Sequence, residues 1–164
     1  MIHYRLSKYD PAFRDAQGRY LRDEWIMASQ VGHHFDGVAL TEEAYRRVED
    51  NYVAAVEAFL REAGVTALAV RGLENRGEVK LDFTDGTWLD VAGALTVVRD
   101  MLRERYGCRL ESEDAFVHAG WDYYLYVGVP GACAGACDFA RAKGLFVEPM
   151  KSPIRSPYGD RAAE

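Results

Sequence analysis

The stretch that most constrains the fold lies in the last third of the chain, from Gly120 to Gly128. It is rich in aromatic and β-branched residues, which favour a strand on a half-buried surface. Side chains alternate across a strand, so the stretch should carry an apolar face and an amphipathic face. We expect Trp121, Tyr123, Leu125 and Val127 to face the core, and Asp122, Tyr124 and Tyr126 to face the other side.

A long amphipathic helix is the second clear element. Thr41 suits the N-cap, and Glu42 and Glu43 follow in the first turn, where the helix dipole favours anions. Apolar residues then recur every three or four positions as far as Ala63, and Gly64 is a typical stop. These signals predict a helix over 41–63.

The remaining pattern predicts short strands alternating with two further helices. Thr87 and Asp90 match the spacing of a capping box, which predicts a helix from Trp88 to about Tyr106. A small-residue helix is expected over 132–143, and strands are expected over 2–9, 65–70, 78–83, 108–111, 116–118 and 145–148. This order predicts an α+β (mixed α/β) fold, with a single mixed, largely antiparallel sheet packed with about three helices. No G-x-G-x-x-G motif is present to indicate a dinucleotide-binding fold.

Length and charge limit the possible classes of protein. A chain of 164 residues fits one domain, and we expect that domain over 1–150 and a flexible C-terminal tail over 151–164. A net charge of −6 argues against general binding of nucleic acid. No apolar run approaches the ~18 residues of a membrane span, and the first residues do not resemble a secretory signal. Three cysteines make no disulfide framework, so a cytoplasmic location is expected.

Two groups of potential metal ligands give weak signals. His34 and Asp36 have the spacing of a ligand pair on a strand or loop, but no third ligand is evident. Cys133 and Cys137 would share one face of the expected helix, and free cysteines of this kind are usually buried in the core. We therefore predict no metal site and no cofactor.

An acid–base pair is the main catalytic possibility. His118 lies four residues before Asp122, and a carboxylate can orient an imidazole for general acid–base catalysis. No nucleophile elbow, Walker A loop or H-E-x-x-H motif accompanies them. A small enzyme with His118 as acid or base, near Asp122, is therefore the alternative hypothesis.

Aromatic and acidic residues outside the clear core pattern indicate a binding surface. Tyrosine and tryptophan combine a large contact area with a polar handle, and they are common at interaction hot spots. The candidates are Tyr20, Trp25, Asp122, Tyr124 and Tyr126. The leading hypothesis is a non-enzymatic protein-binding module. Two other interpretations stay open: a helix covers this face, or the face forms a homodimer interface.

Parts of the chain resemble a family of small uncharacterised bacterial cytoplasmic proteins. The resemblance rests on 118–128, on 144–148 with Ser152 and Pro153, and on an N-terminal pattern over 14–25. It implies no activity or catalytic residues. By analogy, some comparable small acidic bacterial proteins are immunity proteins, which bind and block a partner toxin.

Overall fold

The computed structural model of the protein describes residues 1–154. Within that range the chain forms three α-helices, two short 3-10 helices and nine strands. In chain order they are β1 (Ile2–Ser7), η1 (Pro11–Phe13), η2 (Ala28–Gln30), β2 (His34–Phe35), β3 (Val38–Ala39), α1 (Glu42–Glu62), β4 (Ala67–Glu74), β5 (Trp88–Asp90), α2 (Val91–Leu102), β6 (Gly107–Glu111), β7 (Phe116–Ala119), β8 (Leu125–Val129), α3 (Ala134–Ala142) and β9 (Phe146–Pro149).

Seven strands form one sheet in the order β5-β4-β6-β7-β8-β1-β9. Every pair of neighbours in it is antiparallel. The first strand, β1, lies between β8 and β9, so this edge of the sheet joins segments that are far apart in the sequence. The predicted α+β class, with a largely antiparallel sheet and about three helices, is confirmed. The hairpin of β2 and β3 forms a separate small sheet.

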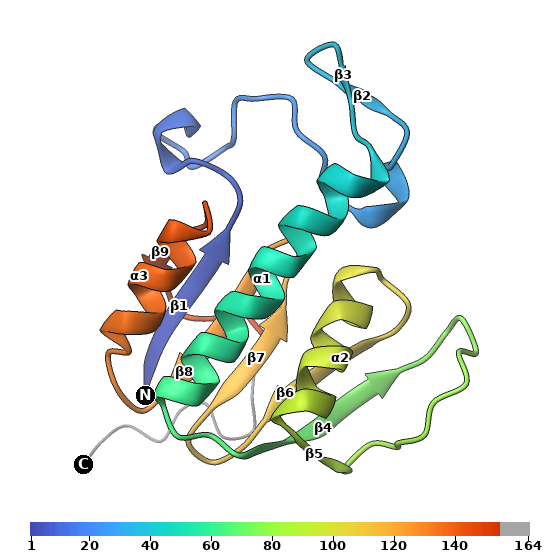
Figure 1. Ribbon diagram of the computed structural model, residues 1–164, viewed down its shortest axis with the longest axis vertical. Helices are drawn as coiled ribbons and strands as arrows, with labels where there is room; N and C mark the ends of the chain where they lie inside the picture. Colours follow the sequence, from blue (N-terminus) through green and yellow to red (C-terminus); the bar gives the residue numbers. More distant parts are fainter. Residues whose placement is uncertain (155–164) are drawn as a thin grey trace.

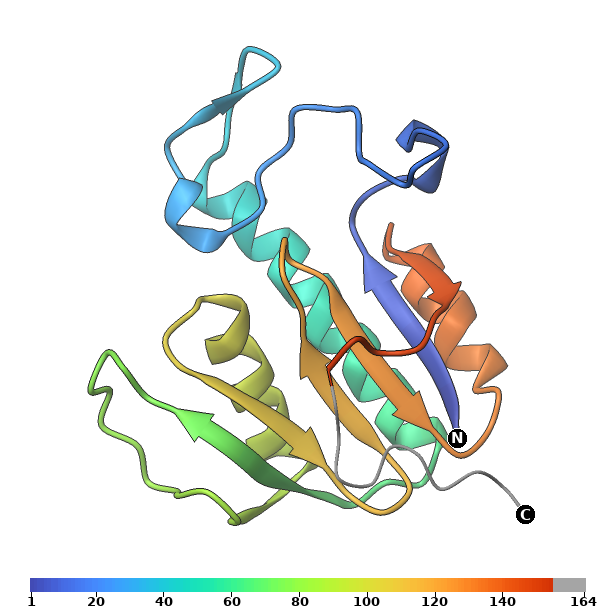
Figure 2. The same cartoon turned by 180° about the vertical axis from the view of Figure 1, so that it is seen from behind.

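The three helices lie on one face of the large sheet (Figure 1). Seen from behind, the sheet's other face has no helix, and the segment that follows β9 crosses it (Figure 2). Along β8 the two faces differ as expected from alternation: Leu125 and Val127 are fully buried in the core under the helices, while Tyr126 is buried on the helix-free side. None of the described helices is long and apolar enough to cross a membrane.

Helix α1 forms where the sequence predicts it. The side chain of Thr41 accepts a hydrogen bond from the Ala44 amide at 3.1 Å, which satisfies one of the donors left unpaired at a helix start. Gly64 has a φ of 69°, the left-handed conformation that glycine adopts at low cost after a helix. The face that α1 turns to the core is apolar except at one position, Glu49.

Two predicted elements differ from the structure near the sheet edge. Helix α2 begins at Val91 with Asp90 as its N-cap, because the three residues before Val91 pair with β4 as the edge strand β5. The predicted strand over 78–83 is absent from the described fold. There the side chain of Asn75 hydrogen-bonds both the amide and the carbonyl of Val79, replacing a strand partner.

The predicted strand over 120–128 is wrong in its first half. Strands β7 and β8 are antiparallel neighbours, with Ala119 paired to Leu125, so the residues between them must reverse the chain. The alternation of a strand therefore begins only at Leu125, and it does not apply to Trp121. Trp121 is 79% exposed instead.

The described part of the expected C-terminal tail is residues 151–154. Residues 151–154 follow β9 across the sheet, and Ser152 hydrogen-bonds His118 of β7. Residues 155–164, the rest of that expected tail, lie outside the part of the chain that the structure describes.

Gly128 offers a test of the packing on the helix-free face. A Cβ at this position would lie 2.1 Å from Cε1 of the Phe116 ring, which cannot move without disturbing the His118 ring stacked on it. Gly128→Ala should lower the free energy of unfolding by about 1–3 kcal/mol. Gly131→Ala is the control, because no atom lies within 4 Å of its Cβ, and it should change stability by less than about 0.5 kcal/mol. Urea denaturation of both variants measures this, and equal stabilities would contradict the prediction.

Candidate functional site

The site centres on the tight turn between β7 and β8. The amide of Gly120 donates to the carbonyl of Tyr124 at 2.8 Å, and the amide of Tyr124 donates to the carbonyl of Trp121 at 3.2 Å. The two central residues, Asp122 and Tyr123, have φ values of 55° and 65°. This is the backbone of a type I′ turn, which usually takes asparagine and glycine there. Aspartate tolerates a positive φ, whereas a bulky tyrosine is strained, at a cost of about 1–3 kcal/mol.

Tyr123 is held in this conformation by an aromatic cluster. Its side chain is buried, and its ring packs edge-to-face against Trp25, Tyr52 and Tyr45, with centroids 4.8, 5.2 and 6.0 Å away. Each such aromatic contact contributes about 0.5–1.5 kcal/mol beyond the area it buries. The cluster therefore offsets the strain in the turn.

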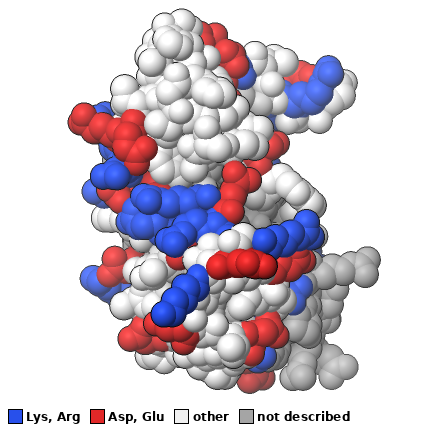
Figure 3. All heavy atoms as spheres, turned by 90° about the vertical axis from the view of Figure 1, so that its right-hand side faces the viewer, with Lys and Arg blue, Asp and Glu red and all other residues white. Residues whose placement is uncertain are grey.

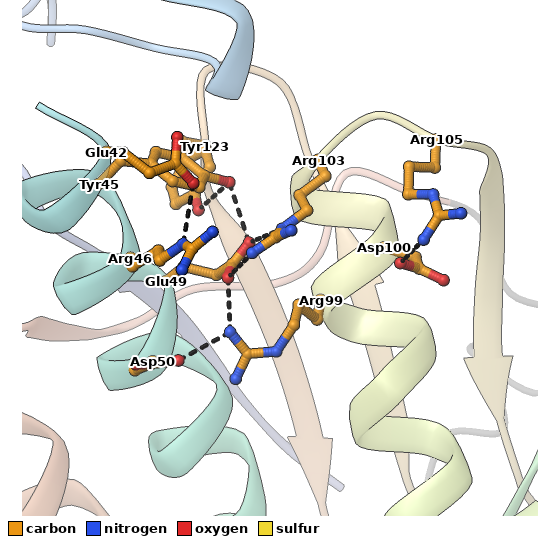
Figure 4. Close-up of polar contacts among 10 residues, drawn as sticks. All are labelled: Glu42, Tyr45, Arg46, Glu49, Asp50, Arg99, Asp100, Arg103, Arg105 and Tyr123. Carbon is orange, nitrogen blue, oxygen red and sulfur yellow. Dashed lines mark hydrogen bonds and ion pairs between the residues drawn. The ribbon is translucent and has the colours of Figure 1, made fainter. Parts of the chain in front are cut away.

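A chain of hydrogen bonds continues from Tyr123 into a buried ion pair (Figure 4). The Tyr123 hydroxyl donates to the Tyr45 hydroxyl at 3.0 Å, which donates to the Glu49 carboxylate at 3.1 Å. Glu49 is completely buried. Arg103 binds its two oxygens at 2.6 and 2.8 Å, and Arg99 binds one of them. The network thus joins α1, α2 and the β7–β8 turn.

The charge on Glu49 is set by two opposing effects. Burial alone would raise the pKa of its carboxyl, but hydrogen bonds from Arg103 and Arg99 outweigh burial and hold the pKa below its ordinary value. Burial raises the pKa of Tyr45 to about 12, so its hydroxyl stays protonated and can donate to Glu49. The network therefore exists as an ionised carboxylate that accepts from three neighbours.

A second support reaches the turn from the end of β1. The Tyr9 hydroxyl lies between the carbonyl oxygens of Trp25, at 3.1 Å, and Asp122, at 2.8 Å, and its single proton serves both. The Lys8 ammonium lies over the rings of Tyr9 and Trp25 and pairs with Glu24 at 3.1 Å. Burial lowers the pKa of Lys8 to about 8 although Glu24 opposes the change. The turn is thus fixed through both backbone and side chain.

This rigid turn displays Trp121 beside two hollows. Trp121 is the most exposed of the large hydrophobic side chains in the described residues. One hollow, of about 160 Å³, has apolar walls from Met27, Met101 and Leu102 and carboxylates from Asp122 and Glu104. The other hollow, of about 440 Å³, is lined by Trp121 together with Gly107, Cys108 and Arg109 of β6. A partner that covers Trp121 would therefore find room beside the ring.

The charges around α2 are mixed. On the side of the molecule that carries this helix, Lys and Arg side chains gather in a band with Asp and Glu side chains beside it (Figure 3). On and after the helix, Arg99 pairs with Glu49 and Asp50, and Arg105 pairs with Asp100 at 3.0 Å. These arginines are committed to carboxylates of the same chain.

The five residues predicted to bind a partner occupy different environments. Trp25 and Tyr126 are buried, at 8% and 6% exposure, so they support the surface from inside. Tyr20 and Tyr124 are partly exposed, and both pack against the Tyr9 ring, with centroids 4.9 and 5.3 Å away. Asp122 is exposed in the turn. The predicted group is therefore only partly a surface, and Trp121, which the sequence pattern placed in the core, is exposed beside it.

His118 has partners other than the predicted one. Its Nε2 lies 2.9 Å from Glu111 Oε1 and its Nδ1 lies 3.0 Å from Ser152 Oγ. The prediction that Asp122 orients His118 is therefore wrong, because the chain reverses between them. Glu111 was among the carboxylates that the sequence places near His118, with Glu113 and Asp114, but Asp122 was preferred as the partner of the imidazole. Glu49 was missed. Its signal was a carboxylate at a position where the helix pattern requires a buried side chain.

The possible metal ligands stay apart. Among the described residues, no group of three or more His, Cys, Asp or Glu side chains could hold a metal ion. His34 lies exposed on the β2–β3 hairpin and Asp36 in its turn, while Cys133 and Cys137 are free and buried beside α1 and β1.

Comparisons of the chain with protein-family models, curated proteins and solved structures give no match.

Glu49→Gln should test the supporting network. It removes the charge that Arg99 and Arg103 neutralise, and breaking a buried pair of this kind should cost about 3 kcal/mol of unfolding free energy at neutral pH. Glu57→Gln is the control on the same helix, because its exposed pair with Arg61 should contribute no more than about 0.5 kcal/mol.

The pH dependence of Glu49→Gln has a definite sign. A carboxyl whose pKa is lowered by folding stabilises the folded state above its ordinary pKa, here 4.5, and loses that effect as the pH falls through the lower folded value. The stability difference between wild type and Glu49→Gln should therefore shrink as the pH is lowered. Urea denaturation as a function of pH measures it, and a constant difference would contradict the assignment.

Proposed function

We propose that the protein is a protein-binding module of the bacterial cytoplasm, of the immunity or inhibitor kind, that recognises its partner through Trp121 and the acidic and aromatic residues around it. One observation carries the proposal. A tryptophan that is 79% exposed stands on a turn whose strained backbone is fixed by Tyr123 and Tyr9. Strained backbone of this kind concentrates at functional sites.

Preorganisation supports a role in binding. Ordering an interface on association costs about 0.5–1.5 kcal/mol for each immobilised side chain, so a side chain already presented on a rigid turn contributes more net affinity. Tryptophan is also among the residues most enriched at hot spots. Folding gains little from leaving Trp121 in solvent, whereas a partner that buries it gains a large apolar area.

The chemistry around Trp121 favours a basic partner. Asp122 and Glu104 line the smaller hollow together with apolar residues such as Met27, Met101 and Leu102. The chain as a whole carries a net charge of −6. Complementary charge steers association and disfavours wrong partners. Tyr20 and Tyr124, both partly exposed, extend the aromatic surface.

The test is a tagged pull-down of the full chain from native cell lysate, followed by titration calorimetry with the protein it identifies. Trp121→Ala should weaken binding by about 30-fold or more, equivalent to a hot spot of about 2 kcal/mol. The change should leave the urea midpoint nearly unaltered, because the side chain is exposed. Trp88→Ala, which removes another exposed tryptophan from the edge strand β5, is the matched control and should bind like wild type.

The outcomes separate the hypotheses. Equal affinity of wild type and Trp121→Ala for the identified partner would exclude Trp121 as the binding centre. Failure of the wild type to capture any stoichiometric partner would reject a stable complex. Light scattering measures the molar mass of wild type and Trp121→Ala and so tests the homodimer alternative. A wild-type dimer that becomes a monomer in Trp121→Ala would identify a second copy of the chain as the partner.

A further inference from the structure

A second group of side chains lies on the helix-free face of the sheet, away from the Glu49 network. His118 on β7 is completely buried, and its two ring nitrogens contact Glu111 of β6 and Ser152 of the segment after β9. The group thus contains a hydroxyl, an imidazole and a carboxylate in hydrogen-bonded series. A nucleophile within reach of a base that a third group orients is the diagnostic arrangement for nucleophilic catalysis.

The carboxylate determines which nitrogen of His118 carries the proton. Arg109 lies 3.4 Å from the same Glu111 oxygen that contacts His118, which favours the ionised carboxylate. An ionised carboxylate only accepts hydrogen bonds, so Nε2 of His118 must carry a proton. In the neutral ring Nδ1 then has a free lone pair, directed at Ser152. In that tautomer the Ser152 hydroxyl donates to Nδ1, the direction that a nucleophile needs toward its general base.

The packing fixes this geometry. The His118 ring is stacked on Phe116, with centroids 4.2 Å apart and planes 17° from parallel. Ser152 is held from the other side, because the amide of Ile154 donates to its Oγ at 3.2 Å. Glu111 and His118 are buried, whereas Ser152 is partly exposed. The group that would react is therefore accessible, and the groups that would activate it are shielded from water.

A hollow of about 440 Å³ lies beside residues that contact or adjoin this group. Its lining includes Arg109, the ion-pair partner of Glu111, together with Ala119, which follows His118 in the chain, and Ile154, whose amide donates to Ser152. This volume falls in the range of about 300–1,000 Å³ that is typical of small-molecule sites.

We propose that Ser152 is an acyl-accepting nucleophile activated by His118 and positioned by Glu111, and that this site hydrolyses small carboxylic esters. The Ser152 oxygen forms a bond to the ester carbonyl carbon while its proton passes to His118 Nδ1. The bond to the alcohol oxygen then breaks, and the leaving alcohol takes that proton. Water adds to the acyl-serine, gives a proton to Nδ1 and releases the carboxylic acid, and the Ser152 oxygen recovers the proton.

Covalent labelling of the full chain tests the proposal. A fluorophosphonate probe should modify the folded protein at one residue, with loss of fluoride, and peptide mass spectrometry should locate the modification at Ser152. Ser152→Ala should abolish labelling, while Ser29→Ala, which removes an exposed serine elsewhere, should label like wild type. Glu111→Gln should slow labelling by about 100-fold, because general-base assistance contributes about 10²–10⁴-fold. Hydrolysis of p-nitrophenyl acetate should follow the same order.

The same contacts would also arise if Ser152 served only to attach the C-terminal segment to the sheet. Urea denaturation of each variant identifies a loss of fold, and labelling is compared only among folded proteins. If folded wild type is not labelled, or if Ser152→Ala is labelled like wild type, Ser152 is not a nucleophile and the proposal fails. Labelling of Ser152 in protein unfolded by urea at the folded rate would likewise overturn it, since activation requires His118 to be in place.

Discussion

The carboxylate of Glu49 holds together the parts of the protein that define the candidate site. It is buried on the core face of α1, and Arg99 of α2 and Arg103, the C-cap residue of α2, neutralise it. Burying an ion pair is costly unless its hydrogen bonds are well made, and here the third donor is Tyr45, which connects the pair to Tyr123 in the β7–β8 turn. The relative positions of two helices and one turn therefore depend on a single negative charge.

The turn shows why such support is necessary. Two consecutive non-glycine residues with positive φ reverse the chain between β7 and β8. An isolated hairpin with Asp122 and Tyr123 at these positions would relax, and it is the aromatic cluster around Tyr123 and the hydroxyl of Tyr9 that prevent this. The cost of the turn is offset by packing elsewhere, and the result is a fixed, exposed Trp121.

The two faces of the sheet use buried polar groups in different ways. On the helix side, Glu49 has two guanidinium partners and a phenol, all of which stabilise the charge and none of which is a nucleophile. On the helix-free side, Glu111 acts on an imidazole whose other nitrogen faces a hydroxyl. The first arrangement suits a structural role and the second suits proton transfer, which is why binding and catalysis are assigned to different parts of one small fold.

Local signals in the sequence were enough to determine the class of fold and most of its elements. Thr41, the apolar repeat after it and Gly64 define α1 without reference to the rest of the chain, because capping and amphipathicity act over a few residues. The site was determined only by the tertiary structure. Because β7 and β8 are neighbours in the sheet, Trp121 lies in the turn between them and is not part of a strand. Likewise, the contacts of His118 with Glu111 and Ser152 join residues up to 34 positions apart, which come together only when the sheet forms.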